Sequence, residues 1–210
     1  DTQKLAVGIA TAHNVYSSQY FGDQNNNFYA GPHAGSGSVG IASGATANIG
    51  IGLSLGTKIS SGFRNILFGV CSGPEITTGN KNILIGCHNA RKLSTGQQNI
   101  ALGARSLDCM STGSYNIAMG FRAGRQQGSL DPTINDHCFT LYLGHTAGDN
   151  SILKGRSSIY IGDGAGRGGL TNNPDFSNDA NIIIGRQAGQ NLQGGQGKTK
   201  TQIPPCKKTS

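Results

Sequence analysis

A short phrase recurs along this chain with a fixed period, and this repeat limits the possible folds more than any other feature. The phrase reads Asn, an apolar residue, a third residue, an apolar residue and Gly, as in NIALG at 99–103. Regular copies are separated by 17 residues, and less regular ones begin at 27, 140, 158 and 181. Because the opening asparagines share one place in the phrase, we expect their amides to stack as a ladder. The predicted ladder consists of Asn48, Asn65, Asn82, Asn99, Asn116 and Asn181.

A second element keeps the same period. Ile59, Ile76, Leu93 and Met110 are each followed by two Ser or Thr residues and then Gly. A unit of 17 residues is too short for a helical hairpin but suits one coil of a β-solenoid. Composition agrees, because Gly contributes 34 of the 210 residues and Glu75 is the one glutamate, so strong helix formers are scarce. The sequence therefore predicts an all-β fold, a parallel β-solenoid or β-helix built from these coils.

The alternation of a strand predicts which side chains fill the coil. The second and fourth residues of the phrase, such as Ile83 and Ile85, are expected inside, with a glycine turn after them. The segment that starts at Ile59 is expected to form a short return strand. The third residue would then point outward, and it is often apolar, as at Leu67 and Tyr142. An exposed apolar column along a rod favours association, so we expect a homotrimer in which this column faces identical chains.

The regularity of the repeat divides the chain into four parts. Residues 1–47 hold degenerate repeats and a polar, aromatic loop, and residues 48–124 hold the regular repeats. Longer loops interrupt the repeats in residues 125–190, and residues 191–210 are expected to form a flexible basic tail. The chain begins without Met, which suggests a processed product or part of a longer polypeptide.

The net charge of +7 raises the question of an anionic partner. The cations are spread thinly outside a group of lysines at 198–208, and no basic helix or aromatic-basic module is seen, which argues against nucleic acid. The longest apolar runs are too short to insert into a membrane. Five cysteines without CxxC spacing indicate free thiols rather than a zinc site or a disulfide framework, and no cofactor is expected.

The segments TGQQNIALGARSL and TGSYNIAMGFRAG resemble the repeats of tail fibres of tailed phages and of related fibrous proteins of other large viruses. More loosely, they are similar to the head domains of trimeric autotransporter adhesins. The resemblance covers residues 48–190 and implies a homotrimeric β-solenoid that carries surface recognition. Coiled-coil heptads, a membrane anchor and a chaperone-like C-terminal domain, which accompany such repeats in these families, are not seen in the sequence.

The resemblance implies a virion structural protein, namely a tail fibre or spike shaft or tip that mediates attachment to a host. The expected partners are identical chains, other virion proteins and a host surface glycan or receptor. The alternative is a bacterial surface adhesin head. Either function places the chain on a virion or at an extracellular surface.

Recognition is expected where the repeat is interrupted, because insertions in a solenoid form loops on one face. Polar insertions at 13–27, 125–138 and 167–179 hold the candidate receptor-binding residues. These candidates are Tyr16, Tyr20, Asp131, Asp136, Asn172, Asn173, Asp175 and Phe176. A second candidate is a basic stripe two residues after the strand glycine, at His88, Arg105 and Arg122, which would suit phosphate or sulfate on a glycan. Both features also suit an ordinary solvated surface.

An enzyme is not expected. A glycan depolymerase usually needs two carboxylates about 5–9 Å apart, whereas acidic residues hardly enter the repeat columns. Asp131 with Asp136, or Asp175 with Asp179, offer the loop pairs that would be needed. An ice-binding array of the Ser/Thr pairs is a further alternative, but adjacent members face opposite ways, and their turn-forming role accounts for them.

Overall fold

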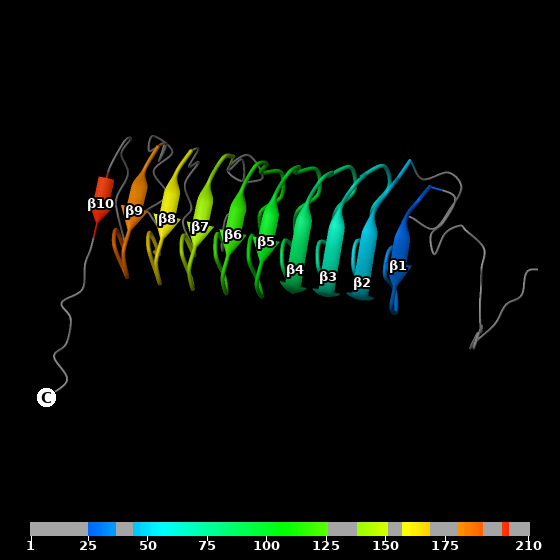
Figure 1. The fold of residues 1–210 in the computed structure, drawn as a ribbon, viewed down its shortest axis with the longest axis horizontal. Coiled ribbons are helices and arrows are strands. Elements are labelled where there is room, and N and C mark those ends of the chain that lie inside the picture. The colour runs from blue at the N-terminus through cyan, green and yellow to red at the C-terminus, as the bar shows by residue number, and fades with distance from the viewer. Residues whose placement is uncertain are drawn as a thin grey trace, which may run out of the picture.

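The computed structural model describes residues 25–36, 44–125, 138–150, 157–168, 180–190 and 199–201. These residues form one sheet of ten parallel strands whose spatial order is the chain order (Figure 1). The strands are β1 (Phe28–Ala30), β2 (Ile49–Leu53), β3 (Ile66–Val70), β4 (Ile83–Cys87), β5 (Ile100–Leu102), β6 (Ile117–Met119), β7 (Leu141–Leu143), β8 (Ile159–Ile161), β9 (Ile182–Ile184) and β10 (Thr199–Thr201). The predicted all-β class and parallel β-solenoid are confirmed.

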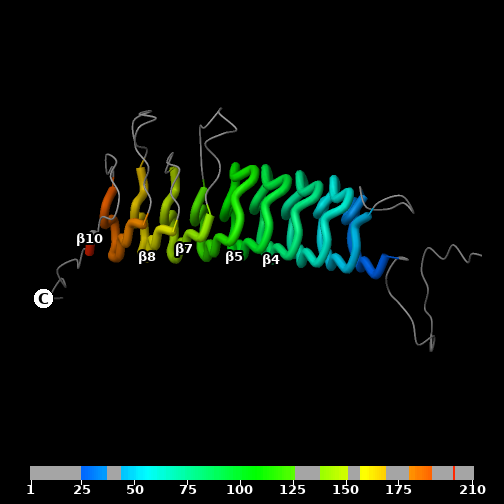
Figure 2. The backbone as a smooth tube through the Cα atoms, turned by 90° about the horizontal axis from the view of Figure 1, so that it is seen from above, coloured from blue at the N-terminus to red at the C-terminus, as the bar shows by residue number. Residues whose placement is uncertain are grey.

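Each strand belongs to one coil of the solenoid. β3 pairs with β4 so that Ile66 lies opposite Ile83, and β4 pairs with β5 so that Ile83 lies opposite Ile100, a step of 17 residues each time. The coils stack like the turns of a spring into a rod (Figure 2). With parallel strands about 4.8 Å apart, the sheet from β1 to β10 is roughly 43 Å long. The rod therefore grows by one strand spacing for each copy of the phrase.

An asparagine ladder holds successive coils together from inside. We number each coil from its ladder residue, so that Asn82 is position 1 and Ile83 position 2 of the β4 coil. Asn82 Nδ2 donates to Asn65 Oδ1 at 3.0 Å and to Gly96 O at 2.9 Å. Asn82 Oδ1 accepts hydrogen bonds from the backbone N and the Nδ2 of Asn99, at 3.0 and 3.1 Å.

Two of these hydrogen bonds, from the backbone N and from the Nδ2 of one asparagine to the Oδ1 of the preceding asparagine, recur along the rod. The buried asparagines that they connect are Asn27, Asn48, Asn65, Asn82, Asn99 and Asn116. Thr140 and Ser158 take position 1 in the next two coils, and the backbone N of Asn181 donates to Ser158 Oγ at 3.2 Å. The predicted ladder is confirmed from Asn48 to Asn116, and Asn181 occupies its expected place.

The strand side chains face the opposite way from the sequence-based prediction. Leu84, at position 3, is fully buried, whereas Ile85, at position 4, is 42% exposed. The ladder explains this, because the amide at position 1 must lie inside the coil to reach the carbonyl of Gly96. Alternation then places position 3 inside and positions 2 and 4 outside. The predicted filling by positions 2 and 4 is wrong, and the inner column consists of Leu67, Leu84, Ala101, Ala118, Tyr142, Tyr160 and Ile183.

The core behind the inner column is thin. Position 12 supplies Ile59, Ile76, Leu93 and Met110, all buried. The predicted return strand at this place is wrong, because these segments are bends rather than strands. Their backbone groups still bond between coils, as Ser94 N does to Ser111 O at 2.8 Å. Each coil thus has one strand, and side chains from its remaining, bent backbone complete the core.

Glycine at position 5 allows neighbouring coils to approach closely where the strand ends. Gly69 has φ +114°, a conformation that side chains rarely tolerate, and a Cβ there would lie 2.2 Å from the carbonyl oxygen of Gly86. The equivalent Cβ on Gly86 would lie 2.5 Å from Gly103 O. The predicted glycine turn is confirmed, and close backbone contact adds a second reason for it.

The last strand falls within residues 191–210, where the sequence predicts a flexible tail. Thr199–Thr201 form β10, which pairs in parallel with β9 and keeps the 17-residue step from Ile182 to Thr199. The repeat of the sheet therefore extends one coil beyond the last recognisable copy of the phrase.

Candidate functional site

The outward side of the sheet is apolar from β2 to β9. Positions 2 and 4 form two exposed or half-buried columns, and we call them together the outer apolar face. Position 2 holds Ile49, Ile66, Ile83, Ile100, Ile117, Leu141, Ile159 and Ile182, and position 4 holds Ile51, Phe68, Ile85, Leu102, Met119, Leu143, Ile161 and Ile184. Soluble monomers rarely expose contiguous apolar surface of this extent. The face is therefore a candidate interaction surface.

Aromatic pairs border the outer apolar face near its middle. Tyr115 and Phe139 stack with ring centroids 4.7 Å apart on the side where the strands begin. Phe121 and His145 stack at 5.4 Å on the side where they end. His145 Nδ1 also lies 2.9 Å from Asp163 Oδ1 on the following coil. These side chains widen the apolar strip around β6 and β7.

The predicted receptor-binding residues lie outside the described residues. This holds for all eight, namely Tyr16, Tyr20, Asp131, Asp136, Asn172, Asn173, Asp175 and Phe176. The positions where the chain leaves and rejoins the coils around two of the longer interruptions are described, however. Asn150 N donates to Arg125 O at 2.7 Å, and Ser157 N donates to Cys138 O at 3.1 Å. The described ends of these two interruptions are therefore hydrogen-bonded to one another across neighbouring coils.

The basic stripe of His88, Arg105 and Arg122 exists as a column on successive coils. All three residues adopt left-handed backbone, with φ of 55°, 58° and 56°. Arg105 N donates to Cys87 O and Arg122 N to Ala104 O, both at 3.0 Å, so each backbone is tied to the preceding coil. The three residues therefore occupy equivalent places on successive coils, as expected, while their binding role stays a prediction.

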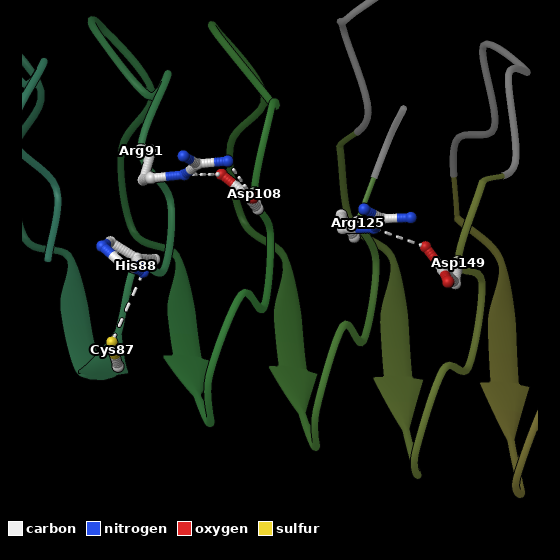
Figure 3. Close-up of polar contacts among 6 residues, drawn as sticks. All are labelled: Cys87, His88, Arg91, Asp108, Arg125 and Asp149. Atoms are coloured by element: carbon white, nitrogen blue, oxygen red, sulfur yellow. Dashed lines mark hydrogen bonds and ion pairs between the residues drawn. The ribbon is translucent and has the colours of Figure 1, made fainter. Parts of the chain in front are cut away.

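A column of alternating charge runs beside the stripe at position 10, and sequence reasoning missed it. The charge column consists of Arg91, Asp108, Arg125, Asp149 and Arg167. Arg91 binds Asp108 through two bonds of 2.8 Å, and Arg125 Nε lies 2.8 Å from Asp149 Oδ1 (Figure 3). The carboxylates are 1% and 3% exposed, whereas the Arg91 and Arg125 side chains are 43% and 11% exposed, so each pair joins two coils through a buried carboxylate.

The Arg91–Asp108 ion pair is bidentate, and its hydrogen bonds raise the pKa of the Arg91 guanidinium. Arg91→Gln should therefore lower the free energy of unfolding by about 1–2 kcal/mol, because the buried Asp108 carboxylate keeps no guanidinium partner. Urea denaturation followed by circular dichroism measures the change. Arg105→Gln is the matched control, since no carboxylate lies within ion-pair distance of Arg105 in the described coils, and it should change stability by less than about 0.5 kcal/mol. Equal losses in both variants would contradict a structural role for the pair.

Among the described cysteines there is no disulfide. Cys71, Cys109 and Cys138 are half-buried, and Cys87 is exposed with its Sγ 3.5 Å from His88 Nδ1 (Figure 3). Burial raises the pKa of the Cys109 thiol. Groups of three or more His, Cys, Asp or Glu side chains able to hold a metal ion do not occur in the described ranges.

The carboxylates of the described coils each sit beside a basic group. Glu75 lies by Lys58, Asp108 by Arg91, Asp149 by Arg125, and Asp163 by His145. Two carboxylates facing one another, as glycoside hydrolysis usually requires, are not among these contacts. The described part of the chain also has no helix with the length and hydropathy needed to cross a bilayer.

Comparison with protein-family models, with curated proteins and with solved structures gives no match to this chain. The fold and the geometry of its surfaces therefore carry the functional argument.

Proposed function

We propose that the protein is a non-enzymatic fibre protein of a virion, a homotrimeric tail-fibre or spike shaft or tip that mediates attachment to a host surface. The observation that carries this proposal is the outer apolar face, which extends from β2 to β9 on the described coils. A rod that associates along its length suits a projecting fibre. The resemblance of the repeats to viral fibre repeats supports the same function.

The occupant of the outer apolar face is a second and a third copy of this chain. Its partner must offer apolar side chains at the same spacing from β2 to β9, and an identical chain does so. From β2 to β9, and including the residue before the ladder residue (position 0) and position 6, the strip is about 20 Å wide and about 34 Å long. That area, roughly 700 Å², is shared between two neighbours in a trimer, and the two contacts together approach the ~800 Å² that one partner buries in a standard interface.

Threefold symmetry about an axis parallel to the rod uses both outer columns. In such a ring each chain meets two neighbours through different edges of one face, because cyclic interfaces with more than two members are heterologous. Position 2 of one chain would then pack against position 4 of the next. The similar exposure of Ile49 and Ile51, both 40%, suits an arrangement in which the two columns are covered equally.

Ile85→Asp should convert the trimer to single chains, because an unpaired carboxylate in the apolar interface costs about 3–5 kcal/mol at each contact. Light scattering on a size-exclusion column measures the mass. Thr95→Asp, on an exposed position of the same coil away from the sheet, is the matched control and should remain trimeric. A trimer that survives Ile85→Asp with unchanged mass would show that this face is not the interface.

Antibodies against the purified chain test the virion assignment. Immunogold labelling in electron microscopy should mark projections of virus particles from the source culture. Label confined to the surface of bacterial cells would contradict the assignment and favour the adhesin alternative.

A further inference from the structure

We infer that the basic stripe is a binding site for a linear acidic polysaccharide, whose carboxylate or sulfate groups lie along His88, Arg105 and Arg122. This inference deepens the proposed function and rests on it, since it names the class of surface ligand that the rod itself would hold. The stripe lies beyond the C-terminal ends of the strands, at position 7, two residues after the turn glycine. It lies outside the two columns, positions 2 and 4, of the outer apolar face.

The charges of the stripe are not neutralised by the protein. The acidic residues of the described coils, Glu75, Asp108, Asp149 and Asp163, are engaged with other basic groups. Neither Arg105 nor Arg122 has a carboxylate within ion-pair distance in this part of the chain. In the neighbouring charge column, Arg91 pairs with Asp108 and Arg125 pairs with Asp149 (Figure 3). Because these carboxylates are neutralised by their own partners, they cancel little of the positive charge of the stripe. A row of uncompensated cations attracts a polyanion.

The stripe is fixed in place before any ligand binds. The Arg122 guanidinium lies over the Phe121 ring, 4.9 Å from its centroid, and this contact restrains the long side chain. The Arg122 Nε is buried and has no hydrogen-bond partner among the described residues. The backbone bonds from Arg105 N and Arg122 N to the preceding coils fix both Cα positions. Less side-chain entropy is therefore lost when an anion binds.

The accessible part of the column ends in the β6 coil. Thr146 follows Arg122 at position 7, but it is 3% exposed and its Oγ1 is buried, so it does not reach a ligand at the surface. Gly164, the next residue of the column, has no side chain. A ligand lying along the stripe would thus span the coils of β4 to β6.

The axial spacing favours a polysaccharide over a nucleic acid. Neighbouring side chains of the stripe are one coil, about 4.8 Å, apart, and an extended chain of pyranose units advances by a nearly equal length for each unit. Phosphates along one strand of duplex DNA recur every ~3.4 Å. Single strands instead need free aromatic rings for base stacking. Phe121, the ring beside the stripe, is already covered by Arg122 and His145.

Fluorescence anisotropy with labelled octasaccharides tests the inference on the full chain. The probes are a heparin octasaccharide for sulfate, a polygalacturonate octamer for carboxylate, maltooctaose as the neutral control and an eight-residue oligothymidylate. We expect one or both acidic glycans to bind, with affinity that falls as salt rises, and maltooctaose not to bind. The response of the two acidic probes identifies the preferred anion.

Arg105→Gln/Arg122→Gln should weaken binding of the acidic glycan about tenfold, since each exposed ion pair contributes up to ~1 kcal/mol. Lys58→Gln/Lys92→Gln is the matched control, because it removes two positive charges from exposed residues at position 11, outside both the stripe and the outer apolar face, and should leave affinity within about twofold. Circular dichroism confirms that both variants remain folded. Equal weakening by both double variants, no binding of either acidic glycan, or oligothymidylate binding as tight as the glycans would overturn the inference. None of these results would alter the trimer mass or the labelling of virions.

Discussion

Asn82→Asp should cost about 3–5 kcal/mol of stability at pH 7 although the two side chains have the same shape. Asn82 Nδ2 donates to Asn65 Oδ1 and to Gly96 O, so the exchange sets a buried carboxylate against two oxygen acceptors. The bonds accepted by Asn82 Oδ1 from Asn99 would remain. The loss therefore isolates the donating half of the ladder.

The effect of Asn82→Asp should depend on pH. Burial and the facing oxygens raise the pKa of the introduced carboxyl in the folded chain above its unfolded value near 3.9. A group with a raised folded pKa stabilises the fold at low pH, and that contribution is lost as pH rises through the folded pKa. Urea midpoints between pH 3 and pH 7 should thus converge with those of the unmodified chain at the acid end. Asn80→Asp, on a half-buried asparagine two residues earlier, should show little loss, and an equal loss there would contradict the ladder account.

Gly69→Ala should cost about 4 kcal/mol, from the strain of its backbone conformation and from overpacking. The new Cβ would lie 2.2 Å from Gly86 O, and the strand pairing of β3 with β4 prevents the coils from moving apart. Thermal melting by circular dichroism at fixed protein concentration measures the effect. Gly164→Ala is the matched control, because its φ is +65° and its Cβ would approach the end of the Gln190 side chain no closer than 3.2 Å.

The control should cost only the ordinary left-handed strain of about 1–2 kcal/mol. Equal melting temperatures for Gly69→Ala and Gly164→Ala would contradict the claim that coil spacing is fixed at position 5. A larger loss in Gly69→Ala would identify close backbone approach, rather than turn geometry alone, as the reason for glycine there.

The period, the ladder and the glycine turn could be predicted from the sequence because each recurs at a constant interval. Asn65, Asn82 and Asn99 are 17 residues apart, and nothing but coil stacking is needed to bring them together. The same regularity did not show which side of the strand faces the core, because both sides carry apolar residues. Leu84 inside and Ile85 outside are equally hydrophobic, so hydropathy alone cannot distinguish them.

The correct facing follows from the ladder once its geometry is known. An amide at position 1 that bonds across the coil to Gly96 must be inside, and position 3 shares its side of the strand. The reason to expect a trimer, an exposed apolar surface along the sheet, still holds after this correction, but that surface is formed by other residues. An exposed apolar column was expected at position 3, and two such columns are found instead at positions 2 and 4.

The charge column shows how an insertion hides a pattern. Arg91, Asp108 and Arg125 are spaced by 17 residues, and this part of the alternation is visible in the sequence. The insertion after Arg125 moves the next member, Asp149, to a separation of 24 residues. Charge pairs across an insertion need the strand register, which only the fold provides.

Sedimentation equilibrium of the purified, unmodified chain tests the central claim most directly. The account predicts one species with three times the chain mass of 21.7 kDa across a wide range of protein concentrations. A species with the mass of one chain, soluble and folded by circular dichroism at the same concentrations, would contradict it.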